Sequence, residues 1–61
     1  MTVVLDVWGG ENSCEHVARK HLTWAVAIDV AKREIEAGFL VNMRAEAAWG
    51  SDEDFDSRAI N

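Results

Sequence analysis

Two histidines and one cysteine are the side chains of this sequence best suited to acid–base, nucleophilic or metal chemistry. They are His16, His21 and Cys14. On a helix, His16 would point about 140° away from His21, so the three side chains could not converge on a zinc ion. Nucleophilic catalysis also needs an activated hydroxyl or thiol and a third, orienting group, and no such arrangement is visible. We therefore expect no enzymatic activity, no metal and no cofactor.

Acidic side chains gather near the C-terminus. The net charge is −5, and residues 51–61 hold four of the acidic side chains, Asp52, Glu53, Asp54 and Asp56. In an extended segment, the three aspartates would line one edge at intervals of about 6.6 to 6.8 Å. Such a row imitates a nucleic-acid backbone and would attract a basic groove, whereas a plain solvated turn is the simpler interpretation. The basic residues are scattered, which disfavours direct binding of nucleic acid.

The sequence predicts a single domain over residues 1–61, with residues 51–61 as an acidic turn or tail. Thr2–Trp8 is rich in β-branched residues and predicts a half-buried strand, with Val3, Leu5 and Val7 facing the core. Trp8 falls on the opposite, polar side. A large aromatic exposed there would be a natural anchor for a protein partner.

A long helix is expected next, from Ser13 or Cys14 to Ala37, ended by Gly38. Its apolar residues form two stripes. His16 falls on an exposed flank, where we expect it to be solvated. Leu22, Val26 and Val30 lie on the back of the helix, where a second molecule should cover them. The other stripe should face the core, with Cys14 and His21 buried; it consists of Cys14, Val17, His21, Trp24, Ile28, Ala31 and Ile35.

Residues 39–49 can be read in two ways. As a strand, Phe39, Val41, Met43 and Trp49 share one face, whereas a second helix would scatter the polar residues around its circumference. The strand is preferred. The predicted fold is therefore α+β, a small two-layer β-α-β(β) domain with one long helix on a sheet of two or three strands. A short edge strand within 55–60 would be the last element, and a strand followed by a helical hairpin is the alternative.

These features favour a protein that acts by binding. We expect a small acidic interaction module, an inhibitor or regulator that occupies a basic, nucleic-acid-binding surface of a partner protein. Small size, acidity and missing active-site chemistry are typical of inhibitors and antitoxins encoded by phages or mobile elements. The alternative is a homo-oligomeric structural subunit without charge mimicry. A domain this small is marginally stable alone, so a homodimer is expected. The sequence also predicts no membrane segment and a cytoplasmic location.

Overall fold

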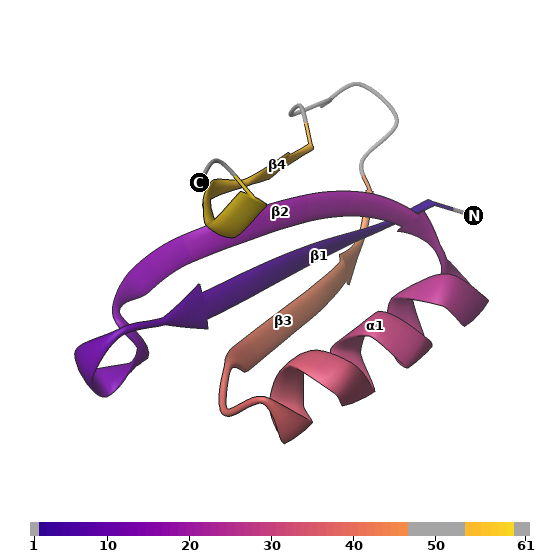
Figure 1. The fold of residues 1–61 in the computed structure, drawn as a ribbon. Helices are drawn as coiled ribbons and strands as arrows, with labels where there is room; N and C mark the ends of the chain where they lie inside the picture. Colours follow the sequence, from indigo (N-terminus) through magenta and orange to yellow (C-terminus); the bar gives the residue numbers. More distant parts are fainter. Residues whose placement is uncertain (1, 47–53, 60–61) are drawn as a thin grey trace.

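The computed structural model describes residues 2–46 and 54–59, which form one helix packed on a four-stranded antiparallel sheet. This confirms the α+β class. The strands are β1 (Thr2–Gly9), β2 (Glu15–Thr23), β3 (Leu40–Ala45) and β4 (Phe55–Asp56), and the helix α1 is Trp24–Glu36. Short 3₁₀ turns cover Glu11–Ser13 and Ser57–Ala59. The strands lie in the order β3-β1-β2-β4, with α1 on one side of the sheet (Figure 1).

The predicted long helix is wrong in its first half, because Glu15–Thr23 is a strand. β1 and β2 form an antiparallel hairpin in which Asp6 lies opposite Arg19. The turn between them contains Gly10, Asn12 and Ser13, all with positive φ, as tight hairpin connections require. The element order is consequently β-β-α-β-β instead of the predicted β-α-β(β), and β1 is central in the sheet.

The predicted strand within residues 39–49 is confirmed over Leu40–Ala45, which excludes the helical hairpin there. Gly38 ends the helix as expected, with a φ of +96° in the left-handed region. The predicted short edge strand is also present, as β4 beside β2. Trp49 lies outside the described residues.

The core lies between α1 and the sheet. Val3, Leu5 and Val7 of β1 are fully buried and face the helix, as predicted. Val4 and Asp6 on the other face of β1 are also buried, so this strand is not half-buried but central. On the helix, the buried residues are Ala27 and Ala31, and the partly buried Val30 also packs against the core. Among the described residues, no helix is long and apolar enough to cross a bilayer.

The starting point of the helix decides which of its residues are buried. Leu22 and Val30, expected on the back of the helix, pack against the core instead, and Val26 alone of that stripe is exposed. Trp24 and Ile35, expected in the core, are 53% and 61% exposed. Cys14 is exposed in the hairpin turn. The two predicted stripes are therefore wrong, because only the residues from Trp24 onward are helical and follow the helical period.

Candidate interaction face of the sheet

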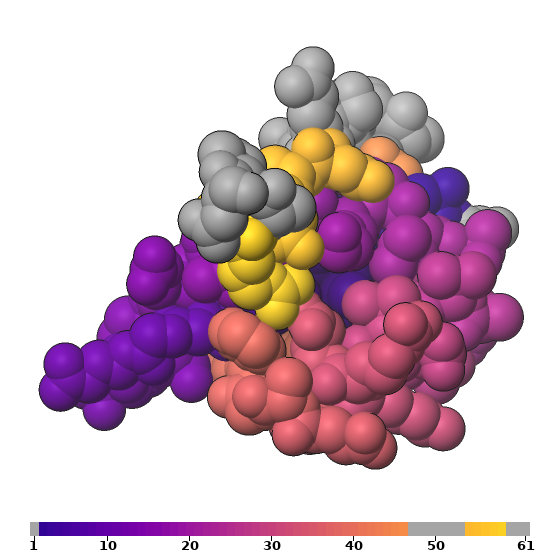
Figure 2. Space-filling view, viewed as in Figure 1, coloured from indigo at the N-terminus to yellow at the C-terminus, as the bar shows by residue number. Residues whose placement is uncertain are grey.

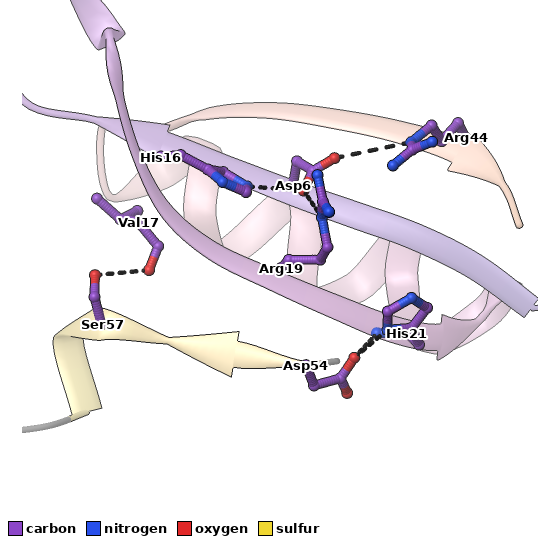
Figure 3. A network of polar contacts seen from close by, with 8 residues as sticks. All are labelled: Asp6, His16, Val17, Arg19, His21, Arg44, Asp54 and Ser57. Carbon is purple, nitrogen blue, oxygen red and sulfur yellow. Dashed lines mark hydrogen bonds and ion pairs between the residues drawn. The ribbon is translucent and has the colours of Figure 1, made fainter. Parts of the chain in front are cut away.

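The sheet face opposite α1 carries a cluster of charged and aromatic side chains. We call it the open face and define it by Asp6, Trp8, His16, Arg19, Leu40, Arg44 and Phe55. Figure 3 views this face, with α1 behind the sheet. The alternation of side chains along each strand places these residues together, although they come from all four strands.

Asp6 is the centre of the open face and is only 4% exposed. Arg19 Nε donates a hydrogen bond to Asp6 Oδ1 at 2.7 Å, and His16 Nε2 lies 2.8 Å from the same oxygen. Arg44 Nε lies 3.9 Å from Asp6 Oδ2 (Figure 3). An ionised carboxylate only accepts hydrogen bonds, so His16 donates through Nε2. A buried carboxylate is thus held by three side chains from two neighbouring strands.

The ionisation of Asp6 follows from these contacts. Burial alone raises the pKa of Asp6, because it disfavours the charged form. The hydrogen bonds and charges of Arg19 and His16 outweigh burial and hold the pKa of Asp6 below its ordinary value. Asp6 is therefore a charged carboxylate at neutral pH.

A β-bulge brings His16 to the open face. Val7 pairs with Ala18, but the next residue, Trp8, pairs with His16, so Val17 is the extra residue in β2. Regular pairing would turn His16 to the helix side. With the bulge, Val17 is buried in the core and His16 faces Asp6. The prediction that His16 is solvated on a helix flank is therefore wrong.

Aromatic rings adjoin this charged centre. Trp8 stacks on His16 with ring centroids 4.5 Å apart, and Phe55 meets the other side of His16 edge-on at 5.0 Å. Leu40, paired with Trp8 across β1 and β3, is more than half exposed. Trp8 is itself half-buried. The predicted anchor residue is therefore part of a fixed aromatic row instead of a lone exposed side chain.

His21 lies beyond this row, on the β4 side of β2. Asp54 accepts a hydrogen bond from the His21 main-chain N–H at 2.6 Å and contacts the imidazole Nδ1 as well (Figure 3). Glu46 Oε1 lies 3.5 Å from His21 Nε2. His21 is thus half-buried among carboxylates at the sheet edge. The expected place in an apolar helix core is wrong.

The four acidic residues proposed for partner binding have different surroundings. Asp52 and Glu53 lie outside the described residues. Asp54 binds His21 but keeps a half-exposed carboxylate. Asp56 accepts hydrogen bonds from Arg58, lies 3.5 Å from Lys20, and has a lowered pKa chiefly because of the Arg58 bond. Asp54 and Asp56 therefore do not form one free edge of charge.

Arg58 fastens the C-terminal segment to the helix side of the domain. Its guanidinium contacts Glu34 of α1 as well as Asp56, and it lies 4.7 Å from the centroid of the Phe39 ring. In Figure 2 this yellow segment lies against the end of α1 and the turn that follows it. Ser57 Oγ also donates to the Val17 carbonyl at 2.9 Å. These contacts fix β4, and with it Phe55, beside β2.

The structure also shows the surroundings of two hydroxyl or thiol side chains, Ser57 and Cys14. His16 is oriented by a carboxylate, as a general base would be, but Ser57 and Cys14 direct their hydrogen bonds to main-chain carbonyls. Residues 2–46 and 54–59 contain no group of three or more metal-ligating side chains.

No family model, no curated protein and no solved structure matches this chain.

Proposed function

We propose that the protein is a small, non-catalytic interaction module that binds a partner protein through the open face. One observation carries the proposal: within the described residues, this face has no helix over it, yet its side chains are held in fixed positions around the buried Asp6 carboxylate. A face that served only for solubility would not need an ordered row of Trp8, His16 and Phe55.

The composition of the open face agrees with that of protein–protein interfaces. Tryptophan, phenylalanine and arginine are enriched at interface centres, where they supply most of the binding free energy. Here Asp6 and Trp8 already restrict the rotamers of Arg19 and His16. Binding then costs less side-chain entropy than it would with free side chains. Leu40 and Phe55 add apolar area that a partner would bury.

The acidic character of the chain supports a partner with a basic surface. The net charge is −5, and Asp54 leaves part of its carboxylate open at the rim of the open face. With Asp52 and Glu53 it would steer a basic, nucleic-acid-binding surface toward the aromatic row. In this role the protein would inhibit or regulate its partner in the cytoplasm, as phage and mobile-element inhibitors do. Asp56 contributes less, because Arg58 already neutralises it.

The test is partner capture with matched variants. Immobilised wild-type protein, Trp8→Ala and Val26→Ala are exposed to the same host lysate at low and high salt. Val26 is an exposed apolar residue on α1 and serves as the control. We expect one basic protein to bind the wild type and Val26→Ala at low salt and to be lost with Trp8→Ala. Equal retention by Trp8→Ala would overturn the open face as the binding surface.

A second variant separates the contribution of the acidic side chains to binding from that of the anchor residue Trp8. Asp52→Asn combined with Glu53→Gln and Asp54→Asn should weaken capture and reduce its dependence on salt. Unchanged capture would contradict the electrostatic contribution to binding, but it would not contradict the open face as the binding surface.

A self-assembling structural subunit is the second candidate function. The observation that favours it is the exposure of Trp24 and Ile35 on α1, far from the open face. Large apolar side chains exposed on a small domain are typical of surfaces that associate. The two candidates are distinguished by partner capture, because a subunit that only assembles with itself should retain no foreign protein from the lysate.

A further inference from the structure

The outer edge of β3 has main-chain groups without a partner among the described residues, because β3 pairs only with β1. The direction of these groups follows from one hydrogen bond: the Glu46 N–H donates to the Thr2 carbonyl. In an antiparallel ladder, alternate residues point toward the neighbouring strand. Leu40, Asn42 and Arg44 therefore point toward β1. Val41, Met43 and Ala45 direct their N–H and C=O groups outward.

The opposite edge of the sheet confirms this alternation. By the same rule, His21 of β2 should point away from β1, whereas Val17 belongs to the bulge and lies outside the regular alternation. The His21 N–H does bond Asp54, and the Val17 carbonyl does accept from Ser57, both on the β4 side. The edge of β2 is thus partly covered by residues 54–57, whereas none of the described residues covers the edge of β3.

An exposed apolar stripe on α1 lies on the same side as this free edge. Ala27 and Ala31 face the sheet, and Glu34 is on the flank that reaches Arg58 beyond β2. At 100° per residue, Trp24, Ile28 and Ile35 fall on the other flank of α1, which is the β3 side. Trp24 and Ile35 are mostly exposed there, and Ile28 is partly exposed.

We propose that a second copy of this chain pairs with β3, antiparallel, about a two-fold axis that passes beside Met43 and is perpendicular to the sheet. Such an axis keeps both helices on one face of a continuous sheet and brings the two stripes of Trp24, Ile28 and Ile35 toward each other. Edge strands that are not covered by another element commonly pair in this way. The dimer surface consists of the β3 edge and one flank of α1 and shares with the open face only side chains of β3 such as Arg44, so this inference does not depend on the proposed function.

Hydrogen bonding and side-chain charge select the register. Outward-pointing residues must pair with outward-pointing residues, and centring on Met43 pairs Val41 with Ala45 of the partner and Met43 with its own copy, giving about six main-chain hydrogen bonds. Arg44 then lies opposite Asn42 of the partner, whose amide oxygen can accept from the guanidinium. Centring on Arg44 instead would oppose two like charges, which destabilises a sheet.

Analytical ultracentrifugation over a concentration series tests the dimer. We expect reversible dimerisation of the wild type, at least a roughly tenfold higher dissociation constant for Ile35→Glu, and no change for Val26→Glu. Val26 is a matched control because it is exposed on the same helix but outside the stripe. A wild type that stays monomeric at all concentrations, or an Ile35→Glu variant that dimerises normally, would overturn the proposal.

Two further variants test the strand pairing itself. Ala45→Pro removes an outward N–H and leaves the ladder to β1 intact, so it should weaken the dimer while preserving the circular dichroism spectrum. Met43→Cys, with Cys14→Ser, should oxidise to an interchain disulfide, because paired residues in this register have Cα atoms about 5.5 Å apart. Leu40→Cys is the control and should crosslink poorly. Faster crosslinking through Leu40→Cys than through Met43→Cys would contradict the register.

Discussion

The imidazole of His16 lies 2.8 Å from the carboxylate of Asp6, because a β-bulge in β2 turns His16 to the face of the sheet on which Asp6 lies. Arg19 holds the same oxygen from the same strand as His16. These two contacts are the structural basis of the open face: Arg19 first and His16 second keep the buried carboxylate ionised, and the contact with His16 orients the ring on which Trp8 stacks.

Replacing Asp6 should destabilise the fold strongly. In Asp6→Asn the buried position loses its charge, and Arg19 and His16 lose a charged acceptor, so we expect a loss of about 2 to 4 kcal/mol in the free energy of unfolding. Chemical denaturation measures it. Asp29→Asn is the control, because the Asp29–Arg33 pair is fully on the surface and should change stability by less than about 0.5 kcal/mol. Equal effects of the two substitutions would contradict the assigned role of Asp6.

Stability should fall in acid because of Asp6 and Asp56. Both have a pKa below the ordinary aspartate value of 3.8 in the folded state, so the unfolded chain binds more protons below that value. Their contribution is therefore fully present above about pH 5 and is lost as the pH falls through the lowered pKa values. The free energy of unfolding measured from pH 7 to pH 2 should show this loss. Asp6→Asn should flatten the curve below pH 4, and an unchanged slope would argue against the lowered pKa.

Arg58→Ala should release the C-terminal segment. The guanidinium joins Glu34, Asp56 and the Phe39 ring, and its removal leaves the largely buried Glu34 carboxylate without that partner. We expect a loss of about 1 to 3 kcal/mol. Hydrogen exchange gives a local readout, because the His21 amide is bonded to Asp54 and should exchange faster when residues 54–59 detach. In Arg33→Ala the His21 amide should keep its protection; equal acceleration there would mean that Arg58 does not fasten the segment.

Gly9 and Gly38 should respond differently to alanine. A Cβ atom at Gly9 would lie 2.7 Å from Phe39 Cε1, so Gly9→Ala should cost about 1 to 3 kcal/mol through crowding. A Cβ at Gly38 meets nothing, and Gly38→Ala should cost about 1 kcal/mol through its positive φ alone. Phe39→Leu should then relieve part of the cost of Gly9→Ala but none of the cost of Gly38→Ala. Thermal or chemical denaturation of the double variants decides between crowding and strain.

Several elements are predictable from the sequence because their signals are local. β1 and β3 consist of residues whose alternation and branching favour strands, and Gly38 ends the helix because it tolerates a positive φ. The short strand at Phe55–Asp56 was likewise expected. The residues after Gly9 carry an ambiguous local signal, because glycine, asparagine and serine are common in hairpin turns as well as before the first turn of a helix.

The sequence by itself determined the α+β class, the apolar first strand and the end of the helix, since these depend on residue type and spacing within a few positions. Only the tertiary structure decided that Glu15–Thr23 is a strand, because its apolar positions fit either period and β1 supplies the hydrogen bonds and the Asp6 partner for Arg19. Because this segment is a strand, the helix starts only at Trp24. Trp24 and Ile35 are consequently exposed, whereas Leu22 and Val30 pack against the core. The bulge at Val17 is a further non-local result: pairing with β1, not any property of His16, turned that ring toward Asp6.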